Sequence, residues 1–426
     1  ANATGESGWL LLGLTGMGYA VGAQAYWVIV GEMIGIAASW GFISRKLKRL
    51  SDETDSITLP DVLAANFDDR WHLIRGVAVA IIAVMVTTYV SAQMVATGKA
   101  FSGFVGLDYR AGVIIGAVII IGYTFVGGYK AVSYTDVVQG VLMLAGLIAV
   151  PLVAINAAGG LDQMAATLHA YDPAFVDMFA VLDGSTAGFV AAVSFAAIGL
   201  PFLGVPQMLI RYMSARDEME LKKARIVSIV VLFIFLFGAV TAGIVGRALF
   251  PGLDDSEQVF PTLASELFPP LLTGVLFVIV LSAIMSTVDS LLLLASSSIV
   301  RDTMQKILGS PKSDATLAGY GKVVTVIIGV IAVFVALYMA ENKLIFWFVL
   351  FSWSGLGAAF GPVVLALLYD KRTTGAGIVA GMLGGFLTSV VWVQYFKAGA
   401  HGLYEAIPGF IVAALATVVV SRMTGK

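Results

Sequence analysis

Four acidic residues fall within or at the edges of apolar segments long enough to cross a membrane: Glu6, Glu32, Asp136 and Asp289. A charged side chain at the centre of a membrane helix costs about 2.5–3.5 kcal/mol on insertion scales. Each of these carboxyl groups therefore needs a positively charged partner, a proton or a bound ion. The sequence predicts cation or proton sites inside a lipid-embedded protein.

One helix face combines hydroxyl groups with an acid. Ala283, Ser286, Thr287 and Ser290 are three or four residues apart and so share a face, which Asp289 flanks. Ligands that are all oxygen suit alkali or alkaline-earth ions and not soft metals. The alternative is that these hydroxyl groups bond back to carbonyls of their own helix, which is common in membranes. The pattern alone leaves both interpretations open.

The elements that position these residues are predicted to be membrane helices. Hydrophobic residues make up 59% of the 426 residues and charged residues 12%, which is too little polar surface to cover a soluble globule. A spanning helix needs about 20 apolar residues. Twelve stretches fit, although the first is short: 8–22, 23–43, 76–104, 111–127, 133–157, 188–213, 226–250, 271–300, 323–340, 344–369, 375–395 and 403–420.

The basic residues predict the orientation of these spans. If the spans alternate in direction, 20 of the 25 Lys and Arg residues lie on one side with the C-terminus. The positive-inside rule makes that side cytoplasmic. The long links 158–187 and 251–270 on the other side carry acids but no Lys or Arg. We expect these two links to be solvated caps and not sites.

Two spans contain residues that break helices. The first opens with the segment 3–8, which includes Gly5 and Gly8, and the sixth contains Pro201 and Pro206. Irregular backbone at membrane depth is tolerated where it lines a cavity or is buried in protein. Breaks five spans apart are expected of a five-plus-five inverted repeat, in which discontinuous helices hold ions and substrate near the midplane. The alternative is a pair of unrelated kinks.

Composition and motif content argue against several other classes of protein. A net charge of −2 offers no basic patch for nucleic acid, and the absence of Cys excludes thiolate chemistry and Cys-ligated metals. The three His residues are widely spaced, so a His-ligated metal site is not expected. We find no catalytic triad, metal cluster or nucleotide-binding loop and therefore expect no enzyme.

Seven short motifs, in order along the chain, resemble the sodium/solute symporter family, closest to the bacterial sodium/proline symporters. They lie at 7–10, 59–61, 106–109, 133–136, 285–287, 357–362 and 402–410. The resemblance implies an all-α membrane protein with a leucine-transporter-like five-plus-five inverted repeat. The repeats would be 1–157 and 158–370, followed by two additional C-terminal helices in 371–426. It also implies a helix before residue 1, together with the missing part of the first core helix.

The same resemblance implies three sets of site residues. Sodium would be bound by backbone carbonyls of Ala3 and Glu6 with Ala283, Ser286 and Thr287. A second cation site or a proton relay would involve Asp136, Asp289 and Ser290. The pocket for the solute would be lined by Glu6, Ser7, Gly8, Tyr89, Phe202 and Pro206. Tyr89 could instead hydrogen-bond within the bundle.

The sequence departs from the proline carriers where the solute would sit. Those carriers tend to have Trp and Tyr where this chain has Ile198 and Phe202, and an Asp one position before Glu6. Glu6 could replace that acid, bind a substrate ammonium group or be a structural acid. Glu32 is expected to pair with hydroxyl groups of the bundle.

These observations predict a multi-pass symporter, in a bacterial inner membrane by resemblance, that couples inward sodium movement to uptake of a small organic solute by alternating access. An amino acid such as proline is the expected solute. A monocarboxylate, pantothenate or another amino acid is the alternative, and a transporter-like sensor domain of a histidine kinase is a competitor from another class. The expected partners are the solute, sodium and the lipid bilayer, without nucleic acid.

Overall fold

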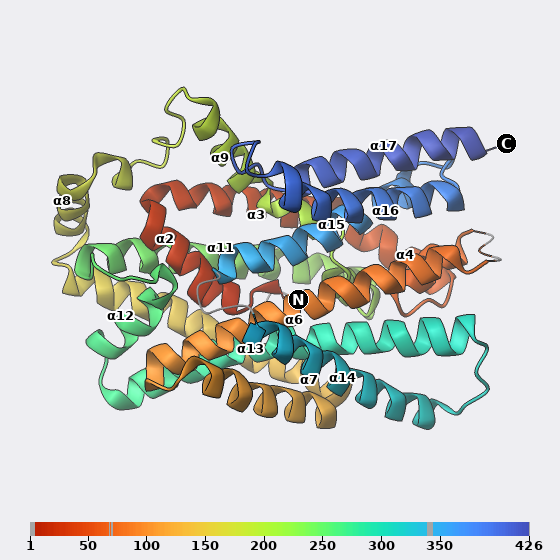
Figure 1. The fold of residues 1–426 in the computed structure, drawn as a ribbon, viewed down its shortest axis with the longest axis horizontal. Coiled ribbons are helices and arrows are strands. Elements are labelled where there is room, and N and C mark those ends of the chain that lie inside the picture. Colours follow the sequence, from red (N-terminus) through yellow and green to blue (C-terminus); the bar gives the residue numbers. More distant parts are fainter. Residues whose placement is uncertain (1–4, 68, 70, 339–343, 426) are drawn as a thin grey trace.

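The computed structural model describes residues 5–67, 69, 71–338 and 344–425. Their regular secondary structure is entirely helical, and the long helices run side by side along the longest axis of the molecule (Figure 1). The expectation of an all-α protein is confirmed within these ranges. Ala3, one of the predicted sodium ligands, lies outside the described residues.

The helices divide into long spanning segments and short connecting ones. The first part of the chain contains η1 (Trp9–Leu14), α2 (Thr15–Val21), η2 (Gly22–Ala25), α3 (Tyr26–Ala38), η3 (Ser39–Ile43), α4 (Ser44–Glu53), α5 (Leu59–Ala65), α6 (Leu73–Val105) and α7 (Tyr109–Ala157). The middle contains α8 (Leu161–Tyr171), η4 (Pro173–Val176), α9 (Thr186–Ala196), η5 (Ala197–Leu203), α10 (Pro206–Met213), α11 (Glu218–Leu249), η6 (Ser256–Gln258) and α12 (Val259–Leu267). The last part contains α13 (Pro270–Ser297), η7 (Ser298–Ile307), α14 (Asp314–Tyr338), α15 (Ile345–Tyr369), α16 (Gly375–Val391), η8 (Trp392–Phe396) and α17 (Ala406–Thr424).

Eleven segments of the described chain are long and apolar enough to cross a membrane. The first of them, Trp9–Glu53, contains two of the predicted spans. Gly22 separates α2 from the stretch that leads into α3, and it has a φ of 63°. That left-handed conformation is easily adopted by glycine and lets the chain change direction there (Figure 1). All twelve predicted spans therefore have a helical counterpart.

Helix α7 also contains two spans, Tyr109–Val126 and Val132–Ala157. The Tyr123 hydroxyl donates to Thr135 Oγ1 over 2.6 Å, although the residues are 12 positions apart. In a straight helix that separation would be about 18 Å. The chain therefore folds back between the two spans, as the alternation of the predicted segments requires.

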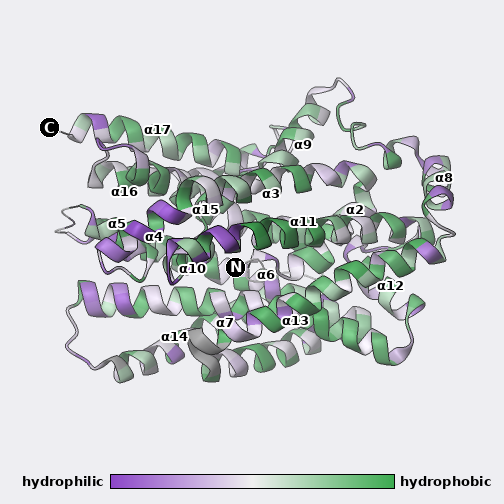
Figure 2. Ribbon diagram, turned by 180° about the vertical axis from the view of Figure 1, so that it is seen from behind, coloured by the Kyte–Doolittle hydropathy of each residue, from purple (hydrophilic) through white to green (hydrophobic). Residues whose placement is uncertain are grey.

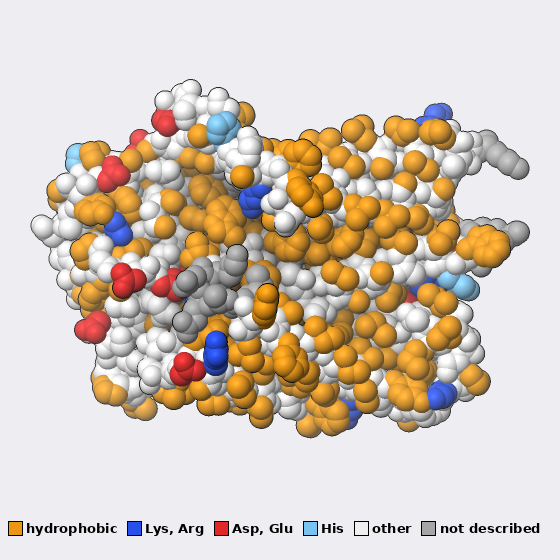
Figure 3. Space-filling view, in the orientation of Figure 1, with side chains coloured by type: hydrophobic (Ala, Val, Ile, Leu, Met, Phe, Trp, Pro, Cys, Tyr) orange, Lys and Arg blue, Asp and Glu red, His pale blue; other side chains and the backbone are white. Residues whose placement is uncertain are grey.

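The outer surface of the long helices is apolar. Large side chains are widely exposed on α7, α13 and α14, among them Val118, Leu271 and Phe334. Hydrophobic atoms cover most of the visible face of the bundle, while acidic groups gather toward the end that carries α8 and α12 (Figure 3). Hydrophilic residues are prominent in α4 at the opposite end (Figure 2). This distribution fits a protein whose middle is in contact with lipid.

Glycines allow the broken sixth span to pack closely against its neighbours. A Cβ added to Gly199 in η5 would overlap the carbonyl oxygen of Gly31 in α3, and one added to Gly204 would overlap the backbone nitrogen of Gly361 in α15. Small residues at such contacts let helix backbones approach each other within a membrane. The irregular backbone is therefore buried between α3 and α15 and kept away from lipid.

Candidate functional site

The first break lies at Glu6 and Ser7, just before η1. The freed backbone N–H of Gly8 donates to Gln93 Oε1 over 3.0 Å, and Gln93 Nε2 donates to Ser7 Oγ over 3.1 Å. The N–H of Trp9 also donates to Ser7 Oγ, over 3.1 Å. Gln93 in α6 therefore supplies a hydrogen bond inside the bundle to a backbone group that the break leaves without a helical partner. Sequence reasoning missed Gln93, although an amide within an apolar span was a usable signal.

The predicted hydroxyl face of α13 lies beside this break. A Cβ added to Gly8 would lie 2.8 Å from Ile284 Cγ1, so the broken backbone packs against α13 at this level. Ala283, Ser286 and Thr287 are all fully buried. Ser286 Oγ donates to the carbonyl of Ala283 over 3.0 Å, which is the back-bonding that the sequence left open. The predicted sodium ligands within the described residues thus lie on two segments that pack together: Glu6 is at the first break, and the other three are on α13.

The second break faces the first. The N–H groups of Gly204 and Val205 donate to the carbonyl of Pro201 over 2.8 Å and 3.0 Å, which closes the end of η5. Helix α10 then begins at Pro206. A Cβ added to Gly5 would lie 3.6 Å from the sulfur of Met208, so the start of α10 lies against the first break.

A small cavity of about 10 Å³ lies at the first break, and both Glu6 and Tyr89 line it. Its lining is Gly5, Glu6, Trp9, Glu32, Tyr89, Val349, Leu350 and Trp353. Phe202 packs edge-on against Trp353 with ring centroids 5.2 Å apart. Ser7, Gly8, Phe202 and Pro206, the other predicted solute residues, do not line the cavity. Its volume accommodates about one water molecule, so a solute needs the surrounding helices to separate.

Glu32 reaches this cavity from α3, which the sequence did not predict. Its side chain is 3% exposed and that of Glu6 is 2% exposed. Oε2 of each has no hydrogen-bond partner among the residues that the structure describes. The expectation that Glu32 pairs with bundle hydroxyl groups is therefore wrong for this part of the chain. The two acids instead share one buried cavity.

The residues of the predicted second cation site surround an arginine. Arg211 donates from Nη2 to Asp136 Oδ2 over 2.7 Å and to Ser290 Oγ over 2.9 Å. Its Nη1 donates to Ser133 Oγ over 3.0 Å. Asp289 is fully buried next to Ser290 and interacts electrostatically with both Asp136 and Arg211. Sequence reasoning counted Arg211 only as an orientation signal and missed its contact with Asp136.

A larger cavity of about 600 Å³ lies next to Arg211 and Ser290. Gln207, Arg301 and Lys322 also line it, whereas none of the predicted solute residues does. It therefore belongs to the end of the bundle that is rich in Lys and Arg. Of the predicted sites, only the second cation site opens onto it.

At the other end of the bundle, Glu257 of η6 connects neighbouring helices through hydrogen bonds and an ion pair. This residue is 1% exposed, and its carboxylate accepts from Lys99 Nζ over 2.7 Å and from the N–H groups of Ile345 and Phe346 over 3.0 Å and 2.9 Å. Burial raises the pKa of Glu257, against the opposing effects of Lys99 and these N–H groups. The expectation of solvated caps is wrong for this residue, because Glu257 binds α6 and the first turn of α15 together.

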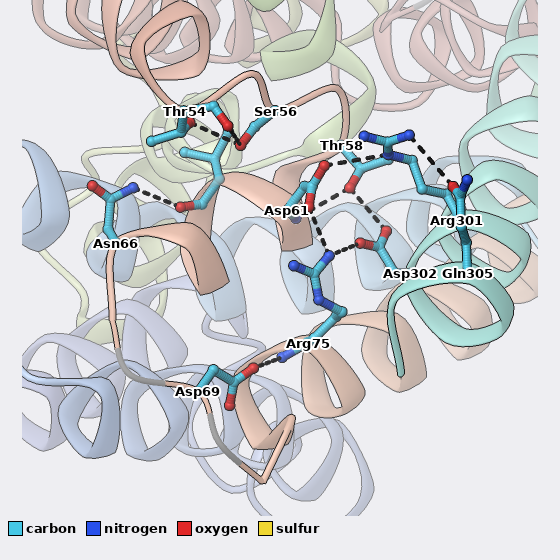
Figure 4. A network of polar contacts seen from close by, with 11 residues as sticks. Thr54, Ser56, Thr58, Asp61, Asn66, Asp69, Arg75, Arg301, Asp302 and Gln305 are labelled. Carbon is cyan, nitrogen blue, oxygen red and sulfur yellow. Dashed lines mark hydrogen bonds and ion pairs between the residues drawn. The ribbon is translucent and has the colours of Figure 1, made fainter. Parts of the chain in front are cut away.

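A second ionic network ties α5, α6 and η7 together (Figure 4). Arg75 Nη1 donates to Asp61 Oδ1 over 2.8 Å and also to Asp302, whose other oxygen accepts from Thr58 Oγ1 over 2.8 Å. Arg301 Nε donates to Asp61 over 3.3 Å. Burial works to raise the pKa of Asp61, but the hydrogen bond and charge of Arg75, together with Arg301, hold it below its ordinary value. Asp61 and Arg75 are thus a buried ion pair.

Comparisons with known proteins agree with this architecture. A model of the sodium:solute symporter family matches residues 1–385. The high-affinity proline transporter PutP of Bacillus subtilis (strain 168) is 36% identical over 430 residues, which cover 100% of this chain and 89% of the transporter. The sodium/proline symporter of Staphylococcus aureus (strain USA300) is 37% identical over 442 residues, covering 100% of this chain and 84% of that protein.

Two solved structures have a similar fold. A Na+-coupled sialic acid symporter in a substrate-bound outward-open state superposes with a TM-score of 0.79 at 18% identity, covering 99% of this chain and 88% of that one. A nucleobase-cation-symport family transporter in a closed conformation gives 0.57 at 11% identity, covering 99% and 91%. At these identities the likeness concerns the fold alone.

Proposed function

The chain belongs to the sodium:solute symporter family, and from that premise we propose that it imports a small organic solute with an ammonium group, first of all an amino acid such as proline. Sodium is the coupling ion, and alternating access around the two broken helices carries sodium and the solute across the membrane together. The observation that carries the proposal is the contact of the first break with α13 at Ile284, beside the buried hydroxyl face. Two curated relatives that cover the whole chain are named for proline, which supports this choice of solute.

Sodium would be bound by the hydroxyl groups of Ser286 and Thr287 with carbonyl oxygens of Ala3, Glu6 and Ala283. Hard oxygen ligands in a buried site fit an alkali ion. The Ala283 carbonyl lies inside α13, where it accepts an intrahelical N–H as well as the Ser286 hydroxyl, so a bound ion would take the place of that hydroxyl hydrogen bond. The solute would lie against the same break, with its ammonium group at Glu6 and its apolar part against Tyr89 and Phe202.

The orientation is also part of the proposal. The C-terminus and the Lys- and Arg-rich links would be cytoplasmic in a bacterial inner membrane. The cavity beside Arg211 would then open to the cytoplasm, while Lys99 and Glu257 close the outer end, as expected of an inward-facing state. The two repeats would be 1–157 and 158–370, with two additional helices in 371–426.

Asp136, Asp289 and Ser290 would form a second cation site or a proton relay. Arg211 already supplies one positive charge to the two acids, so a further cation would balance the remaining carboxylate. The full burial of Asp289 beside a second acid, Asp136, supports this role. A cation that enters must share the site with Arg211 or displace its guanidinium group.

Uptake into proteoliposomes tests the function. Purified protein is reconstituted, and uptake of labelled proline and of a panel of other amino acids, monocarboxylates and pantothenate is measured with an imposed sodium or potassium gradient. We expect sodium, and not potassium, to drive uptake of at least one ammonium-bearing solute. Uptake that ignores sodium and follows a pH gradient instead would place the protein among proton-coupled carriers.

Replacing Thr287 by Val tests the sodium site. The substitution nearly keeps the side-chain volume but removes one proposed oxygen ligand, so apparent sodium affinity should fall by about tenfold or more, with little loss of folded protein. Sodium-dependent thermal stabilisation of the purified protein measures this affinity. Thr316→Val, at an exposed position of α14, is the matched control and should leave sodium affinity unchanged.

Replacing Asp289 by Asn tests the second site. If this carboxylate holds a cation or a proton, the carboxamide should change the number of charges moved per solute or the pH dependence of uptake. Charge movement and solute flux are measured together in proteoliposomes over a range of pH. An unchanged ratio together with an unchanged pH profile would leave Asp289 without a role in coupling.

A further inference from the structure

We propose that Glu6 and Glu32 form one acidic site for a cationic group of the solute, and that Glu32 makes the pocket prefer solutes with a net positive charge. This inference rests on the proposed function of the pocket: proline is still a transported solute, but an analogue with the same ammonium group and no carboxylate should bind more tightly. Glu6 comes from the first break and Glu32 from α3, so only the folded protein brings them to one cavity.

Neither acid has a cationic partner in the described part of the chain. No ion pair there involves Glu6 or Glu32, and Oε2 of each is without a hydrogen-bond partner. Glu405, another buried acid, does have a cationic partner, because its carboxylate accepts from Lys397 Nζ over 2.8 Å. Two buried carboxyl groups with free acceptor atoms are costly unless a cation or a proton joins them. A cationic ligand group would satisfy both at once.

The walls of the cavity favour an organic cation. Trp9, Tyr89 and Trp353 line it, and Tyr89 meets Trp353 edge-on with centroids 6.2 Å apart. Aromatic faces attract ammonium groups through their π electrons, whereas sodium takes hard oxygen ligands. Two carboxyl groups within aromatic walls therefore fit an alkylammonium group better than a second sodium ion.

The net charge of the site then distinguishes between zwitterionic solutes and solutes with a net positive charge. When Glu6 and Glu32 are both ionised, a zwitterion such as proline brings them one positive charge but also its own carboxylate, so the net negative charge of the site is not reduced. A solute with the same ammonium group and no carboxylate removes one negative charge from a buried site. Repulsion between like charges in a medium of low polarity favours the second kind of solute.

L-Proline and L-prolinamide are the matched probes for this preference. They share the pyrrolidine ring, and the amide carries a net positive charge at pH 7. Their dissociation constants are measured in sodium on the purified wild type, on Glu32→Gln and on Glu266→Gln. The last is the control, because Glu266 is exposed in α12. We expect the wild type and the control to bind prolinamide about tenfold or more tightly than proline, and Glu32→Gln to abolish or reverse that ratio.

Three results would overturn the inference: tighter binding of proline by the wild type, an unchanged ratio in Glu32→Gln, or no binding of prolinamide at all. The proposed function is judged separately by sodium-driven uptake. If sodium drives proline uptake while the ratio is insensitive to Glu32, the symport proposal stands and the acidic pair fails. If no solute shows sodium dependence, the symport proposal fails whatever the ratio is.

Discussion

Replacing Arg75 by Gln is expected to lower the free energy of unfolding by about 3–5 kcal/mol. The substitution leaves Asp61 and Asp302 without their shared guanidinium, and both carboxylates are buried. Removing one partner of a buried ion pair is costly because the remaining charge stays out of water. Denaturation of the detergent-solubilised protein, followed by a spectroscopic signal of its helices, measures the change.

Arg45→Gln is the matched control. Arg45 contacts Glu218 over 2.9 Å, but its side chain is 52% exposed and Arg49 contacts the same acid. Exposed pairs contribute about 0–1 kcal/mol, so this variant should stay close to the wild type. Equal losses in the two variants would contradict the role assigned to the Arg75 network.

The loss caused by Arg75→Gln should depend on pH. The folded-state pKa of Asp61 is lowered, so its contribution is fully present above the unfolded value of about 3.9 and is lost as the pH falls through the lowered folded value. The gap in stability between wild type and Arg75→Gln should therefore be widest near neutral pH and narrow below about pH 4. A gap that stays constant over this range would show that lost packing, and not lost charge, is responsible.

Replacing Glu6 by Gln is expected to raise the dissociation constant of the transported solute by about 10- to 150-fold. That range corresponds to the loss of one hydrogen bond to a charged group, about 1.5–3 kcal/mol. Sodium affinity should change much less, because only the backbone carbonyl of Glu6 is proposed to touch the ion. Both affinities are measured on the same preparation, with the solute that gives the largest uptake.

Each outcome for Glu6→Gln assigns the side chain to a different role. Weaker solute binding with near-normal sodium affinity places the carboxylate at the solute. Loss of sodium affinity with unchanged solute preference places it at the ion. If both affinities are kept, Glu6 is a structural acid of the broken helix, and its proposed role in solute binding is wrong.

Local patterns in the sequence were sufficient for the spans and for the row of hydroxyl groups. The thickness of a bilayer fixes the length of an apolar helix, and the helical repeat places Ala283, Ser286 and Thr287 on one face. Glycine and proline mark the two breaks for a similarly local reason, since they change the backbone where they stand. The family resemblance added the expected fold, which the superposed structures confirm.

Only the tertiary structure decided which polar groups meet. Gln93 bonds to the break at Gly8 from 85 residues away, Arg211 reaches Asp136 across 75 residues, and Lys99 reaches Glu257 across 158. Glu32 was assigned to hydroxyl groups because its own helix does not reveal that Glu6 lines the same cavity. Periodicity says which face of a helix a residue occupies, but the packing of distant helices determines what that face contacts, and hence which buried charge is left for a ligand.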